Sequence, residues 1–504
     1  MPDIILLPLD SRPCNTDRPL RLASLAGADL LLPPRELLGR YTRPGRPDLL
    51  KSWLWEEGQS CRNFIINLEM LLYGGLIASR SFGTALEEAA YRMQMLYRLK
   101  ERQPDISLTA FGVILRSTIT VSDAADMEVW RLMPLYSELL GRVHSGEQGL
   151  KRELQRLEAK IPLEIREGYL TVRRRNHHLN IAAVKAVSDG VLDYLVLGQE
   201  DATPQGLHCL EQREIMDIIS RSGLSNRVTL LNGADELGAL LTARALGPAR
   251  GEIAVKGSPD ASWEYIARYE DMTIHDNLEQ HLHLLDWSID AKSDIALMVN
   301  LPHNEEMPDI FLGEEASPSI SYDSLYGKVE DLLSNKSKVG LVDLAAVNGA
   351  DDRLMSGLAE RGALGQLSAF AGWNTAGNSI GYALAHLGAL AAAEKRREQE
   401  EIARDNAVIL LEEYADDWIY QSRCRTVTVN SARTKGISPF DLGSCHAEVE
   451  AELQACMRME LRQLEEQVSF PMLAADIGIN WDIFLPWPRL FEVGVRASAI
   501  SAAR

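Results

Sequence analysis

The sequence predicts an α/β protein with parallel strands: a (β/α)8-barrel-like body followed by a mainly helical C-terminal appendage. Two observations favour this class. Eight strong apolar runs alternate with helix-like stretches, as strands and helices do in βαβ units. The runs are nearly continuous Val, Ile and Leu, which is typical of strands covered on both faces. The alternative is an open doubly wound parallel sheet with two lobes, because periodicity alone does not separate these architectures.

The expected elements follow in chain order. The strong strand-like runs cover residues 4–9, 64–68, 108–115, 194–197, 228–231, 295–299, 339–342 and 367–371, with weaker runs at 30–32 and 253–255. Helical patterns cover residues 86–102, 146–158, 381 to about 420, and 448–468, and the segment 483–493 returns to strand-like residues with prolines. We therefore expect a barrel-like catalytic body over residues 1–385. A helical appendage that ends in the strand-like segment is expected over residues 386–504.

Composition and charge restrict the partners. The 504 residues include 52 Lys and Arg against 72 Asp and Glu, a formal net charge of −20. Such an acidic chain repels phosphate backbones and anionic lipids, which disfavours nucleic acid and membrane surfaces. The chain has no long apolar run, no basic leader and no CxxC pair among its six cysteines. We expect a cytoplasmic protein with a small-molecule or oligosaccharide substrate.

Polar residues gather where the expected strands end. In parallel α/β folds the ligand lies beyond the carboxyl ends of the strands, so this repetition predicts a polar site at one rim. Asp and Asn are also favoured helix caps, which is the structural alternative for each of them. The candidates are Asp10, Arg12, Asn15, Glu69, Arg116, Glu200, Asp201, Asp235, Glu236, Asn300, Asp343, Asn348, Asp351, Trp373, Asn374 and Asn378.

The carboxylate pair Glu200 and Asp201 is the sharpest of these features. Neighbouring side chains on a strand point to opposite faces, so both enter one pocket only if the strand has ended or bulged. Two carboxyl groups in different environments supply one acid and one permanent anion, as glycosidic bond hydrolysis requires. A divalent-metal site is the rival interpretation, and a helix cap at Asp201 beside an exposed Glu200 is the structural one.

Two further segments suit a sugar site. A tryptophan ring stacks on the apolar face of a sugar while amides bond its hydroxyl groups, which favours Trp373, Asn374 and Asn378 as ligands. The loop over residues 72–80 carries Tyr73 and Arg80 near the same rim. Nucleotide-binding glycine motifs, HExxH and GxSxG are absent from the sequence, so we assign no cofactor and no metal ligand.

Several motifs, taken in order, resemble the bacterial domain-of-unknown-function family 4127 over essentially the whole chain. They occupy residues 8–15, 73–76, 79–80, 201–206, 233–236, 348–351 and 372–378. The family pattern usually has two aspartates at the acidic pair, so Glu200 is a departure. The family name implies no mechanism.

The acidic pair is also similar to that of retaining N-acetylhexosaminidases, which use the acetamido group of the substrate as nucleophile. This resemblance implies Glu200 as the residue that polarises the acetamido group and Asp201 as the general acid. We therefore expect a substrate-assisted β-N-acetylhexosaminidase. The alternatives are a metal-dependent amide or ester hydrolase and a non-enzymatic sugar- or metabolite-binding protein. The amphipathic stretch 395–413 is a candidate homodimer surface, with a solvated helix face as the alternative.

Overall fold

The computed structural model describes residues 2–121, 126–247, 250–259, 261–303, 307–314, 320–470 and 477–501. Packing divides the chain into two compact units. Unit 1 comprises Met1–Pro19, Ala28–Gly238 and Tyr269–Met272, and unit 2 comprises Leu20–Gly27, Ala239–Arg268 and Thr273–Arg504. This grouping differs from the expected division at residue 385, which stays a prediction.

Unit 1 contains a six-stranded parallel sheet with the order β2-β1-β3-β4-β5-β6. Its strands are β1 (Ile4–Leu7), β2 (Leu30–Leu31), β3 (Asn63–Asn67), β4 (Ser107–Ile114), β5 (Tyr194–Gln199) and β6 (Val228–Asn232). The predicted α/β class is therefore confirmed for this unit, and every strand here coincides with an apolar run of the sequence.

The expected closed barrel is not what these strands form. In a barrel each new strand is added on the same side until the last strand pairs with the first. Here β2 pairs on one side of β1 and β3 on the other, so the sheet grows in two directions. Among the described residues, β2 and β6 stay at opposite edges and do not pair. The open doubly wound alternative fits.

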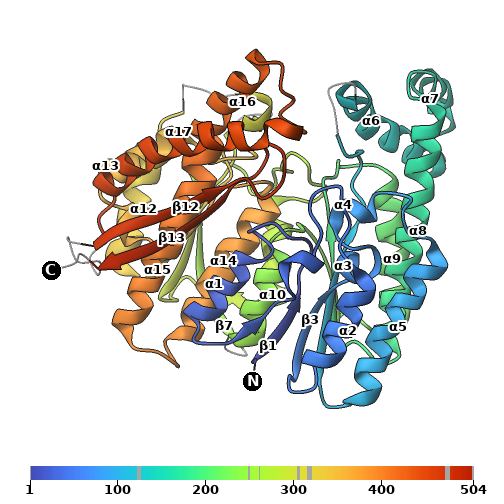
Figure 1. The fold of residues 1–504 in the computed structure, drawn as a ribbon, viewed down its shortest axis with the longest axis horizontal. Helices are drawn as coiled ribbons and strands as arrows, with labels where there is room; N and C mark the ends of the chain where they lie inside the picture. The colour runs from blue at the N-terminus through green and yellow to red at the C-terminus, as the bar shows by residue number, and fades with distance from the viewer. Residues whose placement is uncertain are drawn as a thin grey trace. The chain divides into compact units, whose positions relative to one another are not determined.

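Helices connect the strands of unit 1 and pack against its sheet. One face packs Ile5, Phe64 and Leu195 in a single core with residues from α2, α5, α8 and α9. On the other face, Gly238 of α10 approaches Leu6 and Phe111. Figure 1 shows α2, α3 and α5 grouped beside β3. The helices that begin in the first half of the chain are α1 (Asp17–Leu25), α2 (Pro47–Glu57), α3 (Leu68–Tyr73), α4 (Leu76–Ser79), α5 (Leu86–Arg102), α6 (Asp126–His144), α7 (Lys151–Glu158), α8 (Leu163–Ser188), α9 (Leu207–Arg221) and α10 (Leu237–Leu246).

Unit 2 repeats the same strand order in a five-stranded parallel sheet, β11-β10-β9-β7-β8. Its strands are β7 (Gly251–Gly257), β8 (Trp287–Ile289), β9 (Ile295–Asn300), β10 (Lys338–Asp343) and β11 (Ala369–Ala371). The first strand, β7, again has its successor β8 on one side and the next strand, β9, on the other. The sequence patterns did not mark β8, which has only three residues.

The C-terminal helices belong to unit 2 and are packed on it. The helices are α11 (Ile274–Leu285), α12 (Asp323–Asn335), α13 (Asp352–Glu360), α14 (Ala376–Ala393), α15 (Gln399–Glu413), a π-helix (Tyr414–Cys424), α16 (Arg425–Thr434) and α17 (His446–Gln467). On one face of the five-stranded sheet, Leu387 of α14 packs over Gly340.

Short 3-10 turns occur in both units. They lie at Arg35–Leu37, Gln148–Leu150, Ile310–Leu312, Leu364–Gln366 and Gly443–Cys445.

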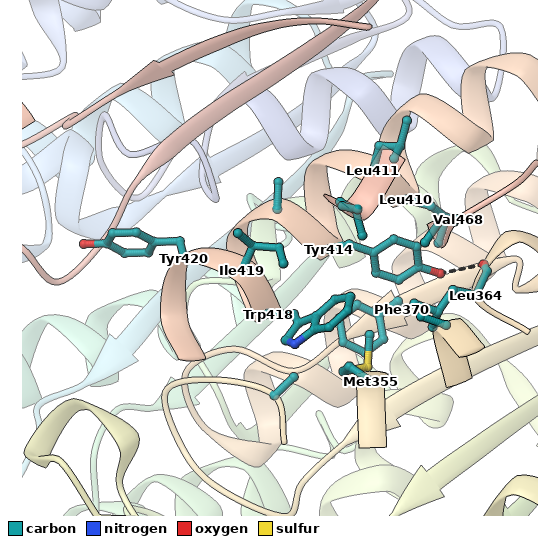
Figure 2. Close-up of a cluster of buried hydrophobic side chains, with 14 of the residues drawn as sticks. Met355, Leu364, Phe370, Leu410, Leu411, Tyr414, Trp418, Ile419, Tyr420 and Val468 are labelled. Atoms are coloured by element: carbon teal, nitrogen blue, oxygen red, sulfur yellow. Dashed lines mark hydrogen bonds between the residues drawn. The ribbon is translucent and has the colours of Figure 1, made fainter. Parts of the chain in front are cut away.

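The π-helix contributes three large, fully buried side chains to the core of unit 2, Tyr414, Trp418 and Tyr420. Trp418 is fully buried and lies beside Phe370 and Met355 (Figure 2). The hydroxyl group of Tyr414 donates a hydrogen bond of 2.8 Å to the carbonyl oxygen of Leu364. The appendage is therefore a packed part of unit 2.

The last described strands form an antiparallel pair, β12 (Ile477–Phe484) and β13 (Gly494–Ser501). Two prolines of the expected strand-like segment, Pro486 and Pro488, lie between these strands. Proline has no backbone N–H group to donate, so it fits this position outside the hydrogen-bonded ladder. Within the described part of the chain, no helix has both the length and the apolar character needed to cross a bilayer.

Candidate functional site

The carboxyl ends of β1 and β3 are the natural place for a ligand in unit 1. In a doubly wound sheet the connections leave these two strands in opposite directions, which opens a crevice between the loops that follow them. Asp10 and Arg12 follow β1, and Glu69 follows β3. The structure therefore places three of the predicted residues at the switch point of the sheet.

A buried cluster of charges forms around Arg12. Its guanidinium group donates to Asp10 Oδ2 from Nε at 2.9 Å and to Asp235 Oδ2 from Nη1 at 3.1 Å. The Nδ2 group of Asn15 donates to Asp10 Oδ1 at 3.0 Å and to Asp235 Oδ1 at 3.3 Å. All four side chains are buried, and the Asn15 Oδ1 atom has no hydrogen-bond partner among the described residues. Two carboxylate groups therefore share the guanidinium group of Arg12.

Glu69 is a buried carboxyl group that connects two strands. Its Oε2 atom accepts from Asn67 Nδ2 at 2.9 Å and its Oε1 atom accepts from the backbone N–H of Val113 at 3.0 Å. Burial raises the pKa of Glu69 to about 7. Tyr73, on the same helix, lies beneath the guanidinium group of Arg175, at 4.3 Å from the ring centre. Contacts with other residues of unit 1 therefore fix the side chains of both Glu69 and Tyr73.

Glu200 and Asp201 do converge on one point. Strand β5 ends at Gln199, and Asp201 has a φ of +20°, so the backbone has left the extended form. The Nη1 atom of Arg116 lies 3.8 Å from Glu200 Oε1 and 3.2 Å from Asp201 Oδ2. Both neighbouring carboxylates thus reach one guanidinium group, as the early end of the strand allows.

The two carboxylates have different surroundings. Glu200 is buried, its Oε1 atom is paired with Arg80, and its Oε2 atom has no hydrogen-bond partner in the described part of the chain. The Asp201 side chain is 29% exposed. Arg116 is held by Thr118 and by the carbonyl oxygen of Ile119. The pair therefore combines a buried anion that has a vacant acceptor with an accessible carboxylate.

Glu236 turns back onto its own loop. Its Oε2 atom accepts from the backbone N–H of Ala234 at 2.8 Å, and the carboxylate lies against Gly233, whose φ is +136°. A side chain at Gly233 would collide with this carboxylate. The interaction shapes the loop after β6 and so positions Asp235 beside Arg12.

A polar network that sequence reasoning missed lies at the ends of β5 and β6. The Nε2 atom of His208 lies 3.3 Å from Asp271 Oδ2 and 3.3 Å from Cys209 Sγ, and its Nδ1 atom lies 3.3 Å from Ser117 Oγ. Burial would lower the pKa of His208, but its hydrogen bonds with Asp271 and Cys209 raise that pKa to about 9. The neighbouring residues His208 and Cys209, shortly after Gly206, were the sequence feature that could have pointed to this network.

The predicted residues of unit 2 hold loops together. Trp373 is only 4% exposed, and its ring centre lies 6.3 Å from that of Phe491, so the ring packs within unit 2 and its sugar-binding role stays a prediction. Asn378 donates to Thr375 Oγ1 at 3.0 Å, and Asn374 has a φ of +68°. These residues lie in unit 2, whereas the two carboxylate clusters lie in unit 1.

Asp343 organises the loop after β10. Its carboxylate accepts from Asn300 Nδ2 at 2.8 Å and from the backbone N–H of Asp351 at 2.6 Å. Burial, with the nearby charge of Asp351, raises the pKa of Asp343 to about 6. Asp351 itself caps α13 by accepting from two backbone N–H groups, and Asn348 donates to Asp309. The capping alternative thus accounts for Asp351.

Comparison with known proteins identifies the family. The model of the family described as "Protein of unknown function (DUF4127)" matches residues 4–496. The chain belongs to this family. No curated protein and no solved structure gives a significant match. The family match confirms the resemblance to family 4127 noted from the sequence, and it does not test the similarity to N-acetylhexosaminidases. The DUF4127 description assigns no activity to the clusters above.

Proposed function

We propose that the protein is a glycoside hydrolase that acts on an N-acetylhexosaminide at the carboxyl ends of the strands in unit 1. The observation that supports this most directly is the vacant Oε2 atom of buried Glu200 beside the accessible Asp201. A buried acceptor without a donor costs about 1–3 kcal/mol. A ligand that brings an N–H group to this atom removes that cost.

In this proposal Glu200 binds the acetamido N–H of the substrate. Arg80 fixes the carboxylate through Oε1 and leaves Oε2 free for the ligand. A negative charge at the N–H polarises the amide, which makes its carbonyl oxygen a better nucleophile toward the anomeric carbon. The bond from this oxygen to the sugar forms as the bond to the leaving oxygen breaks.

Asp201 is the proposed proton donor to the leaving oxygen. It is accessible and adjacent to Glu200, and positioning is the first requirement for an acid catalyst. Its contact with Arg116 must be displaced by the substrate. Glu69 is the competing donor, since its pKa is about 7. Both Glu69 oxygens already accept hydrogen bonds, so we assign it to the support of the loop after β3.

The test is hydrolysis of a panel of aryl glycosides with and without a 2-acetamido group. We expect release only from acetamido substrates, slower release when the acetyl group is fluorinated, and loss of about 100-fold or more in kcat for Asp201→Asn and Glu200→Gln. Asp217→Asn, an exposed aspartate of α9, is the matched control and should retain the rate. If Glu69→Gln loses activity and Asp201→Asn does not, Glu69 and not Asp201 is the general acid.

The alternatives give different results in the same assays. A non-enzymatic sugar-binding protein would gain thermal stability from the sugar without turnover. A metal-dependent amide or ester hydrolase would cleave those substrates and lose activity with a chelator. No release from any glycoside by the wild-type protein refutes the glycosidase proposal.

We further propose a cytoplasmic location, since none of the six cysteines, all in the described part of the chain, forms a disulfide. A homodimer through residues 395–413 stays a proposal as well. The apolar side chains Ile402 and Leu410 of α15 are buried within unit 2, so a dimer would have to use the remaining polar face. Cell fractionation and light scattering test these two points.

A further inference from the structure

Three side chains of different chemistry meet at the edge of the sheet in unit 1. Nε2 of His208, Sγ of Cys209 and a carboxylate oxygen of Asp271 all lie within 4.8 Å of one another. His208 and Cys209 occupy the first turn of α9. Asp271 arrives from the segment Tyr269–Met272, which belongs to unit 1 although the chain on either side of it belongs to unit 2.

The segment that carries Asp271 is fastened at several points. The carbonyl oxygen of Tyr269 accepts from Ala202 N at 2.7 Å, and the Oδ1 atom of Asn232 accepts from the backbone N–H groups of Asp271 and Met272 at 3.3 and 3.2 Å. Tyr269 has a φ of +68°, a conformation that costs free energy in a residue other than glycine. The fold thus fixes the aspartate opposite the histidine.

We propose that His208, Cys209 and Asp271 bind a zinc ion. Zinc bonds of about 2.0–2.3 Å at tetrahedral angles separate neighbouring ligand atoms by roughly 3.3–3.7 Å. The His208 nitrogen lies 3.3 Å from the sulfur and 3.3 Å from the carboxylate oxygen. A nitrogen, a sulfur and an oxygen donor together suit zinc, whereas magnesium and calcium prefer oxygen ligands alone.

The surroundings of the ligands are those of a metal centre. Ser117 Oγ lies 3.3 Å from the second ring nitrogen of His208 and orients the ring. Asp271 accepts from Asn232 Nδ2 at 2.7 Å and from Gln212 Nε2 at 2.8 Å. Hydrogen bonds of this kind fix metal ligands and tune their basicity. Asn232 is the last residue of β6, and Gln212 also bonds Gln199, the last residue of β5.

Zinc would replace protons that these groups carry. Nε2 of His208 lies 2.9 Å from the carbonyl oxygen of Thr203, and the proton shared there is released when the nitrogen binds the metal. Cys209 loses its thiol proton in the same step, so thiolate and carboxylate together balance the charge of the ion. Three protein ligands leave a fourth position for water or a substrate atom. The inference does not rest on the glycosidase proposal, since Glu200 and Asp201 are not ligands.

The test is metal binding by the tag-free full-length protein after dialysis against a chelator. Zinc is titrated in competition with a chromogenic chelator, and cobalt(II) is used as a spectroscopic probe. We expect one zinc per chain and, with cobalt, a thiolate-to-metal charge-transfer band together with the visible bands of a tetrahedral site. Cys209→Ser and Asp271→Asn should weaken zinc binding about tenfold or more.

A matched control separates the site from incidental thiol binding. Cys445 is another partly exposed cysteine, and it lies in unit 2. Cys445→Ser should match the wild-type protein in zinc stoichiometry, in the cobalt spectrum and in the rise in Tm on adding zinc. Cys209→Ser should match the wild-type protein in the Tm measured without metal, but should lose the other three properties. Absence of stoichiometric zinc binding, or binding that Cys209→Ser and Asp271→Asn leave unchanged, overturns the proposal.

Discussion

Replacing Glu69 by Gln should change how the stability of the protein depends on pH. The folded state raises the pKa of this carboxyl group from 4.5 to about 7 because the side chain is buried. At about 1.36 kcal/mol per pKa unit, ionisation of Glu69 removes roughly 3 kcal/mol of stability as the pH rises. The stability associated with the neutral form is fully present below pH 4.5. It is lost as the pH rises through 7.

Glutamine at position 69 does not ionise, so this loss is absent from the variant. The difference in unfolding free energy, Glu69→Gln minus wild type, should be constant below pH 4.5, rise by roughly 3 kcal/mol between pH 4.5 and 7, and then level off. A constant offset of about 1–3 kcal/mol will lower the whole curve, because the glutamine NH₂ group faces Asn67 or Val113, which donate to the carboxylate. The shape of the curve, not its offset, carries the prediction.

The assay is urea unfolding followed by circular dichroism at half-unit steps from pH 4 to 8, with the shift in midpoint converted to free energy by the m-value. Glu87→Gln, an exposed glutamate of α5, is the control and should give a flat difference curve. A flat curve for Glu69→Gln, or one that falls as the pH rises, would refute the burial argument.

Three further changes test the packing. Arg12→Met removes the guanidinium group that pairs with buried Asp10 and Asp235 and should lower the unfolding free energy by about 3–5 kcal/mol in urea titrations; a loss below about 1 kcal/mol contradicts the cluster. Tyr414→Phe removes the buried hydrogen bond to Leu364 and should cost about 1–3 kcal/mol, whereas Tyr91→Phe, at an exposed ring, should cost nothing measurable in the same titration. Asp343→Asn should gain stability relative to wild type as the pH rises from about 4 to 6 and then stay level, which thermal unfolding across this range checks.

Most strands of the two parallel sheets were predictable because local composition marks them, and the three-residue strand β8 is the exception. Strand β5 is buried along its whole length, so its sequence is apolar from Tyr194 to Gly198 and becomes polar at Gln199, where the strand ends. The order of the strands has no such local mark. Pairing β2 and β3 on opposite sides of β1 joins segments far apart in the chain, and the same apolar runs are compatible with a barrel.

The sequence predicted which types of residue lie at the strand ends, but it did not predict which of these residues contact one another. Asp10 and Arg12 lie at the end of β1 as expected, but the partner of Arg12, Asp235, is 223 residues away and no sequence pattern pairs them. Asp271 follows no strand, so the rule that favoured strand ends passed it over. Trp373 does lie at a strand end, yet packing buries it, since an aromatic ring at that position fills a core as readily as it binds a sugar.

The sequence by itself determined the α/β class, most strand positions, the family, and the presence of carboxylates at the strand ends, because these follow from local periodicity, composition and motifs. Only the tertiary structure decided that the chain forms two open sheets with the same strand order, that Glu200 and Asp201 share Arg116, and that His208, Cys209 and Asp271 meet. Each of these depends on contacts between segments far apart in the chain. Such contacts are selected by the free energy of the whole packed unit, which no local pattern records.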